Sequence, residues 1–209
     1  MTTPATTGTA GSVIKSCTAC GVQLSKTTIA KIGKTTIPAA TFVYNGSVRK
    51  PVPTVRDAKG NKLVKGTDYT VAYKNAKATK AATAKNVGKY TVVVTFKGKY
   101  RGTVKKTFVI NPQATVINKL TKPAKKQIKV TWAKRTAQVT GYEIQYSTTK
   151  GFTKATTKTV KVTNAKTNSR VIKQLKAKKK YWVKVRTYKT VNNVKYNSKW
   201  SPAKTIVTK

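Results

Sequence analysis

Hydrophobic and polar residues alternate along short stretches of this chain, and turn-forming residues separate one stretch from the next. In the first half, the alternation covers residues 41–44, 68–73, 88–96 and 103–111. In the second half, it covers residues 127–132, 141–146 and 181–186. A period of two sends successive side chains to opposite faces of an extended backbone. The pattern therefore predicts an all-β protein built from two tandem antiparallel β-sandwiches.

The two series of strands are separated by a short linker. Pro112 ends the first series, because proline cannot donate a hydrogen bond to a strand ladder. We therefore predict a first domain over residues 36–112 and a second over residues 115–209. Residues 1–35 show little periodicity, which predicts a flexible or partly ordered N-terminal segment.

The composition supports the strand prediction. Val and Ile together number 35 and Thr numbers 37, whereas Leu and Met together number only 5. Residues branched at Cβ fit a pleated, half-buried sheet better than a helix. No run of about 18 apolar residues occurs, so we expect no membrane insertion.

The charge excludes most catalytic chemistry. The chain has 45 Lys or Arg, three acids and no His, which gives a formal net charge of +42. Histidine-dependent triads and His/carboxylate metal sites are therefore excluded. Asp57, Asp68 and Glu143 are scattered, and Glu143 falls on the outward register of its strand. We predict a protein that is not an enzyme and needs no cofactor.

The positive charge is spread along the chain. Residues 1–35 carry +4, residues 36–112 carry +14 and the remainder carries +24. Lys outnumbers Arg by 39 to 6. Lys acts as a hydrated point charge, whereas bidentate recognition of phosphate favours Arg. This balance predicts non-specific attraction to polyanions.

The second half resembles a fibronectin type III domain. The resemblance rests on Trp132, on the strand Gly141-Tyr142-Glu143-Ile144-Gln145-Tyr146, and on Leu175 followed six residues later by Tyr181. That spacing is similar to the family's tyrosine corner, which implies structural roles for Trp132, Leu175 and Tyr181. Ala177-Lys178 stands where the family usually has Pro-Gly.

Residues 36–112 resemble the bacterial Ig-like modules of Gram-positive surface proteins. The matching stretches include Thr41-Phe42-Val43-Tyr44-Asn45-Gly46, Gly66-Thr67-Asp68-Tyr69 and Gly98-Lys99-Tyr100-Arg101-Gly102. The pairing of such a module with a Lys-rich type III domain implies a secreted or cell-surface location with cell-wall association. The implied roles are adhesion, wall association or spacing.

Cys17 and Cys20 form a Cys-x-x-Cys-Gly motif, which resembles the hairpins that precede Ig-like modules in such proteins. They are the weak candidates for a metal site, but structural zinc normally takes four protein ligands. A local disulfide, a site shared by two chains and free thiols remain alternatives, and a structural remnant is favoured.

A basic and aromatic cluster is the candidate ligand-binding surface. Strand alternation predicts that Trp182, Lys184, Arg186 and Tyr188 face outward, next to Lys199 and Trp200. Rings and cations in this arrangement could bind glycans. The competing interpretation is an internal cation–π contact, or rung, between Trp200 and Arg186. It is favoured because Ser198-Lys199-Trp200-Ser201 resembles a degraded Trp-Ser-x-Trp-Ser motif of cytokine receptors.

Three functional hypotheses follow. The first is a surface adhesion module that binds anionic cell-wall polymers, acidic glycans or extracellular DNA. The second is a non-specific nucleic-acid binder, which only the charge favours. The third is a passive spacer that presents another region of a larger surface protein. We expect a monomer, with a dimer through Cys17 and Cys20 as the alternative.

Overall fold

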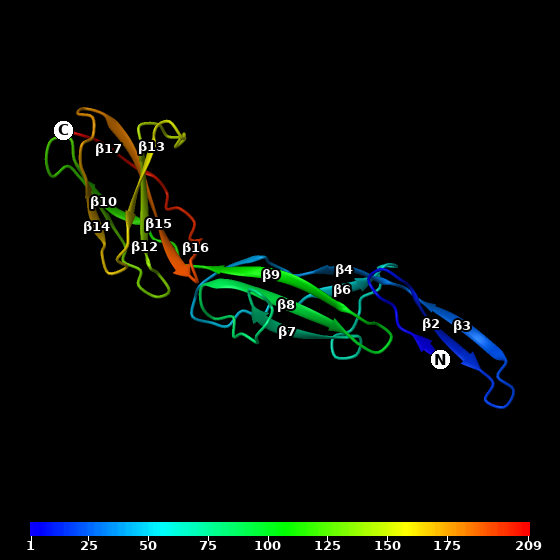
Figure 1. Ribbon diagram of the computed structural model, residues 1–209. Helices are drawn as coiled ribbons and strands as arrows, with labels where there is room; N and C mark the ends of the chain where they lie inside the picture. Colours follow the sequence, from blue (N-terminus) through cyan, green and yellow to red (C-terminus); the bar gives the residue numbers. More distant parts are fainter. The chain divides into compact units, whose positions relative to one another are not determined.

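The computed structural model describes residues 1–209 and contains two compact units of β-strands (Figure 1). The first unit comprises Met1–Phe42, Val48–Lys85 and Lys89–Val109, and the second comprises Val43–Ser47, Asn86–Gly88 and Ile110–Lys209. The all-β prediction is confirmed. No helix in the structure has the length and apolar character needed to cross a membrane. The domain boundaries at 36–112 and 115–209 stay predictions.

The second unit contains two antiparallel sheets. One has the order β10-β11-β14, with bounds Ile117–Thr121, Ile128–Trp132 and Ser169–Ile172. The other has the order β13-β12-β15-β16, with β17 also paired to β15; the bounds are Thr157–Val162, Gly141–Ser147, Lys180–Val191, Val194–Asn197 and Lys204–Val207.

The core of this unit lies between the inward faces of its sheets. Trp132, Tyr142 and Ile144 are fully buried in it. The Trp132 and Tyr142 rings lie 5.0 Å apart between centroids. Each such side chain contributes about 1.5–3 kcal/mol through removal of apolar surface from water. The alternation read from the sequence therefore reports directly which face of each strand is buried.

Tyr181 anchors the loop that precedes β15. Its ring is buried beside Leu175, and its hydroxyl accepts a hydrogen bond from the Lys176 backbone N–H at 3.0 Å. Lys178, in the same loop, has a φ of 49°. A left-handed backbone costs a residue with a Cβ roughly 1–2 kcal/mol. The turn therefore keeps its shape without glycine, at a cost in strain.

The first unit contains a four-stranded sheet and a two-stranded one. The larger has the order β5-β9-β8-β7, with bounds Thr41–Val43, Thr103–Asn111, Gly88–Phe96 and Tyr69–Asn75. The smaller pairs β4 (Ile32–Thr36) with β6 (Thr54–Asp57). Ile32 and Val55 from the small sheet share a core with Tyr69, Val94 and Phe96 of the large one.

The N-terminal residues form strands that the sequence pattern did not predict. β1 (Thr2–Thr3), β2 (Gly11–Ser16) and β3 (Gln23–Ile29) make a separate three-stranded sheet, in which β2 and β3 form a long hairpin (Figure 1). Six of the seven residues of β3 are exposed. β3 has almost no buried face and β2 is only half-buried, so neither strand carries a clear alternation of hydrophobic and polar residues. Ala5 and Ile29 are buried in the core of the first unit, and Val13 packs against it.

Replacement of Lys178 by glycine is expected to stabilise the second unit. Glycine removes the left-handed strain, and its larger unfolded-state entropy offsets part of the gain, which leaves about 0.5–1 kcal/mol. Thermal or denaturant unfolding of Lys178→Gly measures this gain. Lys178→Ala is the control, because it removes the same charge but keeps the strain. Equal stabilisation by both variants would show that charge, not backbone strain, is responsible.

Candidate functional site

The alternation of β15 divides its side chains between the core and the opposite face of the sheet. Tyr181, Val183 and Val185 point into the core. Lys184 and Arg186 lie on the other face and are only half-buried. This face holds most of the predicted ligand-binding residues.

Four side chains on this face form a cation–aromatic stack: Phe152, Lys184, Trp200 and Arg186. Lys184 Nζ lies 3.9 Å from the centre of the Phe152 ring and 5.0 Å from that of Trp200. The Arg186 guanidinium carbon lies 4.3 Å from the same Trp200 ring. Each contact of a cation with a ring face contributes about 0.5–1 kcal/mol when exposed. The rung between Trp200 and Arg186 predicted from the sequence is present.

Two serines place Trp200 in the stack. The hydroxyls of Ser198 and Ser201 accept hydrogen bonds from the backbone N–H groups of Thr187 and Val185, at 3.1 and 3.0 Å. The backbone N–H groups of the same serines donate to the carbonyls of Thr187 and Val185. Through these hydrogen bonds, the segment 198–201 lies alongside β15 in the place of a regular neighbouring strand. This spacing brings the tryptophan ring over Arg186.

Glu143 lies under the cations of the same sheet, and its burial was not anticipated. It is on the outward register of β12, yet only 6% of its surface is exposed. Arg186 donates to its Oε2 through Nε at 2.8 Å and Nη2 at 2.6 Å, and Lys195 donates to Oε1 at 2.5 Å. Burial raises the pKa of Glu143, but hydrogen bonds from Lys195 and Arg186 outweigh it and lower the pKa below its ordinary value. Glu143 therefore holds both cations in place as a carboxylate.

The expectation that Tyr188 is exposed was wrong. Its side chain is 1% exposed, because Lys161 and Lys195 lie 5.1 and 5.9 Å from its ring centre. Its hydroxyl is buried without a hydrogen-bond partner. A Cβ added at Gly141 would lie 2.9 Å from that hydroxyl, so the glycine makes room for the ring. Tyr188 is a packed side chain and not an open platform.

The remaining candidates lie apart from the stack. Trp182 is half-buried, with Lys180 Nζ 5.1 Å from its ring centre, and Lys199 is exposed. The structure thus brings Lys184, Arg186 and Trp200 together. The sequence pattern missed Phe152, Glu143 and Lys195, which come from other strands or loops. Cations of the chain itself already cover faces of the candidate rings.

Cys17 and Cys20 lie at the turn between β2 and β3. The turn is closed by hydrogen bonds from Cys17 N–H to the Val22 carbonyl and from Gly21 N–H to the Cys17 carbonyl. Both cysteines are free thiols, and Cys20 is exposed. A hydrogen bond with the Cys20 side chain, together with backbone N–H groups, lowers the pKa of Cys17. No group of three or more His, Cys, Asp or Glu side chains is placed to hold a metal ion.

Replacement of Glu143 by glutamine tests the ion cluster. At neutral pH, Glu143→Gln is expected to lower the free energy of unfolding by about 1–3 kcal/mol, because two cations lose their carboxylate. The folded-state pKa lies below the unfolded one, so this stabilisation is present above about pH 4.5 and is lost as the pH falls through the folded value. Denaturant unfolding between pH 3 and 7 should show the two proteins converging at acid pH. A stability difference that does not change with pH would contradict the role of the carboxylate.

Comparison with known proteins finds a family match for most of the second unit. The family model of the fibronectin type III domain matches residues 111–205. A two-domain fibronectin type III segment of chicken tenascin aligns at 16% identity with a TM-score of 0.48, covering 79% of this chain and 98% of that one. The three-domain FN1-FN3 fragment of chicken CNTN1 aligns at 16% identity and a TM-score of 0.39, covering 95% and 77%. No curated protein gives a significant match. Residues 111–205 are therefore similar to the fibronectin type III domain.

Proposed function

We propose that this chain is a non-enzymatic adhesion module of a secreted or cell-surface protein and that it binds anionic polymers through its lysines. The fibronectin type III domain is a common extracellular module of adhesion and structural proteins. Its neighbour over residues 36–112 is proposed to be a bacterial Ig-like module. Together they would associate with a Gram-positive cell wall.

The observation that supports this proposal is the excess of cations over side-chain carboxylates. All three of those carboxylates already accept hydrogen bonds within the chain. Asp57 accepts hydrogen bonds from Asn61 and from the Lys59 backbone, and the bond from the Asn61 side chain keeps its pKa low. Asp68 accepts from the Val64 N–H at 2.7 Å, and Glu143 holds Arg186 and Lys195. Three carboxylates cannot neutralise 45 cations. The exposed lysines are therefore left to counterions or to an external polyanion.

The chemistry of lysine determines what kind of ligand fits. A lysine ammonium is a hydrated point charge on a flexible stem, so it attracts negative charge without reading its geometry. Candidate ligands are anionic cell-wall polymers such as teichoic acids, acidic glycans and extracellular DNA. Self-repulsion at this charge density destabilises the folded state. A bound polyanion would relieve that repulsion.

The salt dependence of binding tests the proposal. Affinity for teichoic acid, a heparin-like glycan and DNA should fall linearly on a plot of log K against log salt, by about 0.9 for each phosphate of duplex DNA neutralised. A neutral glycan should not bind. No binding to any polyanion at low salt would leave the passive spacer. Preference for one glycan that persists at high salt would indicate a lectin-like site instead.

A pair of matched variants separates charge from side-chain identity. Four exposed lysines from both units are changed together, first to glutamine and then to arginine: Lys62, Lys77, Lys122 and Lys125. The glutamine variant should show a shallower salt slope, while the arginine variant keeps the slope of the parent. Equal slopes for the parent and the glutamine variant would contradict distributed lysine contacts.

A further inference from the structure

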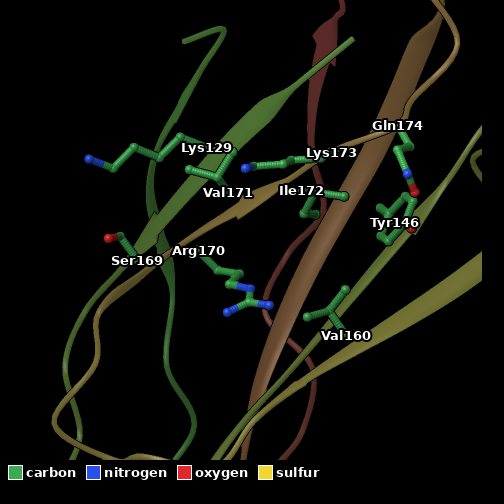
Figure 2. A pocket seen from close by; sticks show the side chains of 9 residues that line it. All are labelled: Lys129, Tyr146, Val160, Ser169, Arg170, Val171, Ile172, Lys173 and Gln174. Atoms are coloured by element: carbon green, nitrogen blue, oxygen red, sulfur yellow. The ribbon is translucent and has the colours of Figure 1, made fainter. Parts of the chain in front are cut away.

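The second unit has a groove at one edge, where an outer strand of each sheet lies. β13 and β14 are the outer strands of their respective sheets. A hollow of about 700 Å³ is lined by residues from these strands and from β11 and β12. Figure 2 shows Arg170 extending from β14 toward Val160, whereas Lys129 and Lys173 extend away from Tyr146. The two sheets thus leave an opening along their edges.

The position of Arg170 follows from the register of β14. Ile172, two residues further on, is buried in the core, and residues two apart share a face of a strand. Arg170 therefore projects from the core-facing side of β14 at the open edge of the sandwich. A guanidinium there can form two parallel hydrogen bonds with one carboxylate or sulfate.

The cations of this hollow are unpaired within the chain. Arg170, Lys129 and Lys173 make no side-chain hydrogen bond, ion pair or ring contact in the structure, and no carboxylate lines the hollow. Arg186 and Lys184, by contrast, are engaged by Glu143 and by aromatic rings. The groove therefore holds cations that are free to bind an external anion.

A second hollow extends the first and gives the opening length. It has a volume of about 340 Å³, shares Tyr146 and Gln174 with the first, and adds Lys158 and Lys176. We call the two hollows together the edge groove. Positive side chains thus lie along its course on both sides of Tyr146. This arrangement fits a linear chain of anionic units better than one small anion.

The edge groove contains an aromatic ring and an aliphatic side chain among polar residues. Tyr146 is half-buried against the core, and Val160 lies beside it. The C–H faces of sugar rings pack on aromatic and aliphatic side chains, while their carboxylate or sulfate groups reach cations at the rim. A phosphodiester polymer would use the cations and leave the Tyr146 ring uncovered.

We propose that the edge groove binds a linear acidic glycan that carries carboxylate or sulfate groups. This inference rests on the proposed function and names the place where one class of polyanion is held. Exposed lysines elsewhere then provide attraction at a distance. Arg170, Lys158 and Tyr146 provide the contacts that align the glycan chain.

Two charge-matched triple variants test this assignment. The groove variant carries Lys158→Gln, Arg170→Gln and Lys176→Gln. The control variant carries Lys119→Gln, Lys150→Gln and Lys166→Gln, which are exposed lysines outside the edge groove. The probe is a sulfated octasaccharide that contains uronic acid, with binding measured at about 0.15 M salt. We expect the groove variant to lose about tenfold or more in affinity and the control variant less than about twofold.

Amide NMR of the full chain provides a second readout that does not depend on any variant. Addition of the octasaccharide should shift the amides of residues 169–174 and of Tyr146. Equal losses in both variants, or shifts spread evenly over lysine-rich turns, would overturn the edge groove and leave the proposed function intact. Absence of binding by the parent protein would overturn both. Stronger groove-dependent binding of teichoic acid than of the octasaccharide would replace the glycan with a phosphodiester polymer.

Discussion

Repulsion among 45 cations, with three carboxylates to offset them, is the constraint under which the whole chain folds. The folded state must gain enough from apolar burial to outweigh this repulsion, and the two cores of β-branched and aromatic side chains supply that gain. Cations that lie close to the sheets are compensated locally. Glu143 holds two of them, and aromatic ring faces hold others.

The cations consequently fall into two groups with different roles. Lys184 and Arg186 are part of the fold, because Phe152, Trp200 and Glu143 engage them. Lys129 and Lys173, like many lysines at turns and on outward strand positions, extend into solvent. The first group stabilises the sheet that carries β15. The second group is the one that an external polyanion can reach.

Much of the fold could be predicted from the sequence, because its strands have one buried face. The stretches 88–96 and 103–111 coincide with β8 and β9, and the alternation around Tyr181 and Val183 identified which side of β15 is inward. β3 escaped prediction because both of its faces are largely exposed, and β2 because its residues are half-buried with no clear difference between its faces. Periodicity detects burial and not backbone pairing.

The candidate site was predictable only where a sequence motif determines its contacts. The rung between Trp200 and Arg186 followed from a serine spacing that fixes the final segment to β15. The burial of Glu143 and Tyr188 did not follow, because the covering lysines, Lys195 and Lys161, come from neighbouring strands. The edge groove was likewise hidden, since it exists only where the outer strands of two sheets face each other across the core.

Lysine acetylation read by mass spectrometry, with and without a bound acidic glycan, tests the division of the cations most directly. The account predicts that the glycan protects Lys158 and Lys176, while the acetylation rate of Lys184 does not change because Phe152 and Trp200 already enclose its ammonium. Protection of Lys184 with no protection of Lys158 would contradict the account, because it would place the ligand on the cation–aromatic stack.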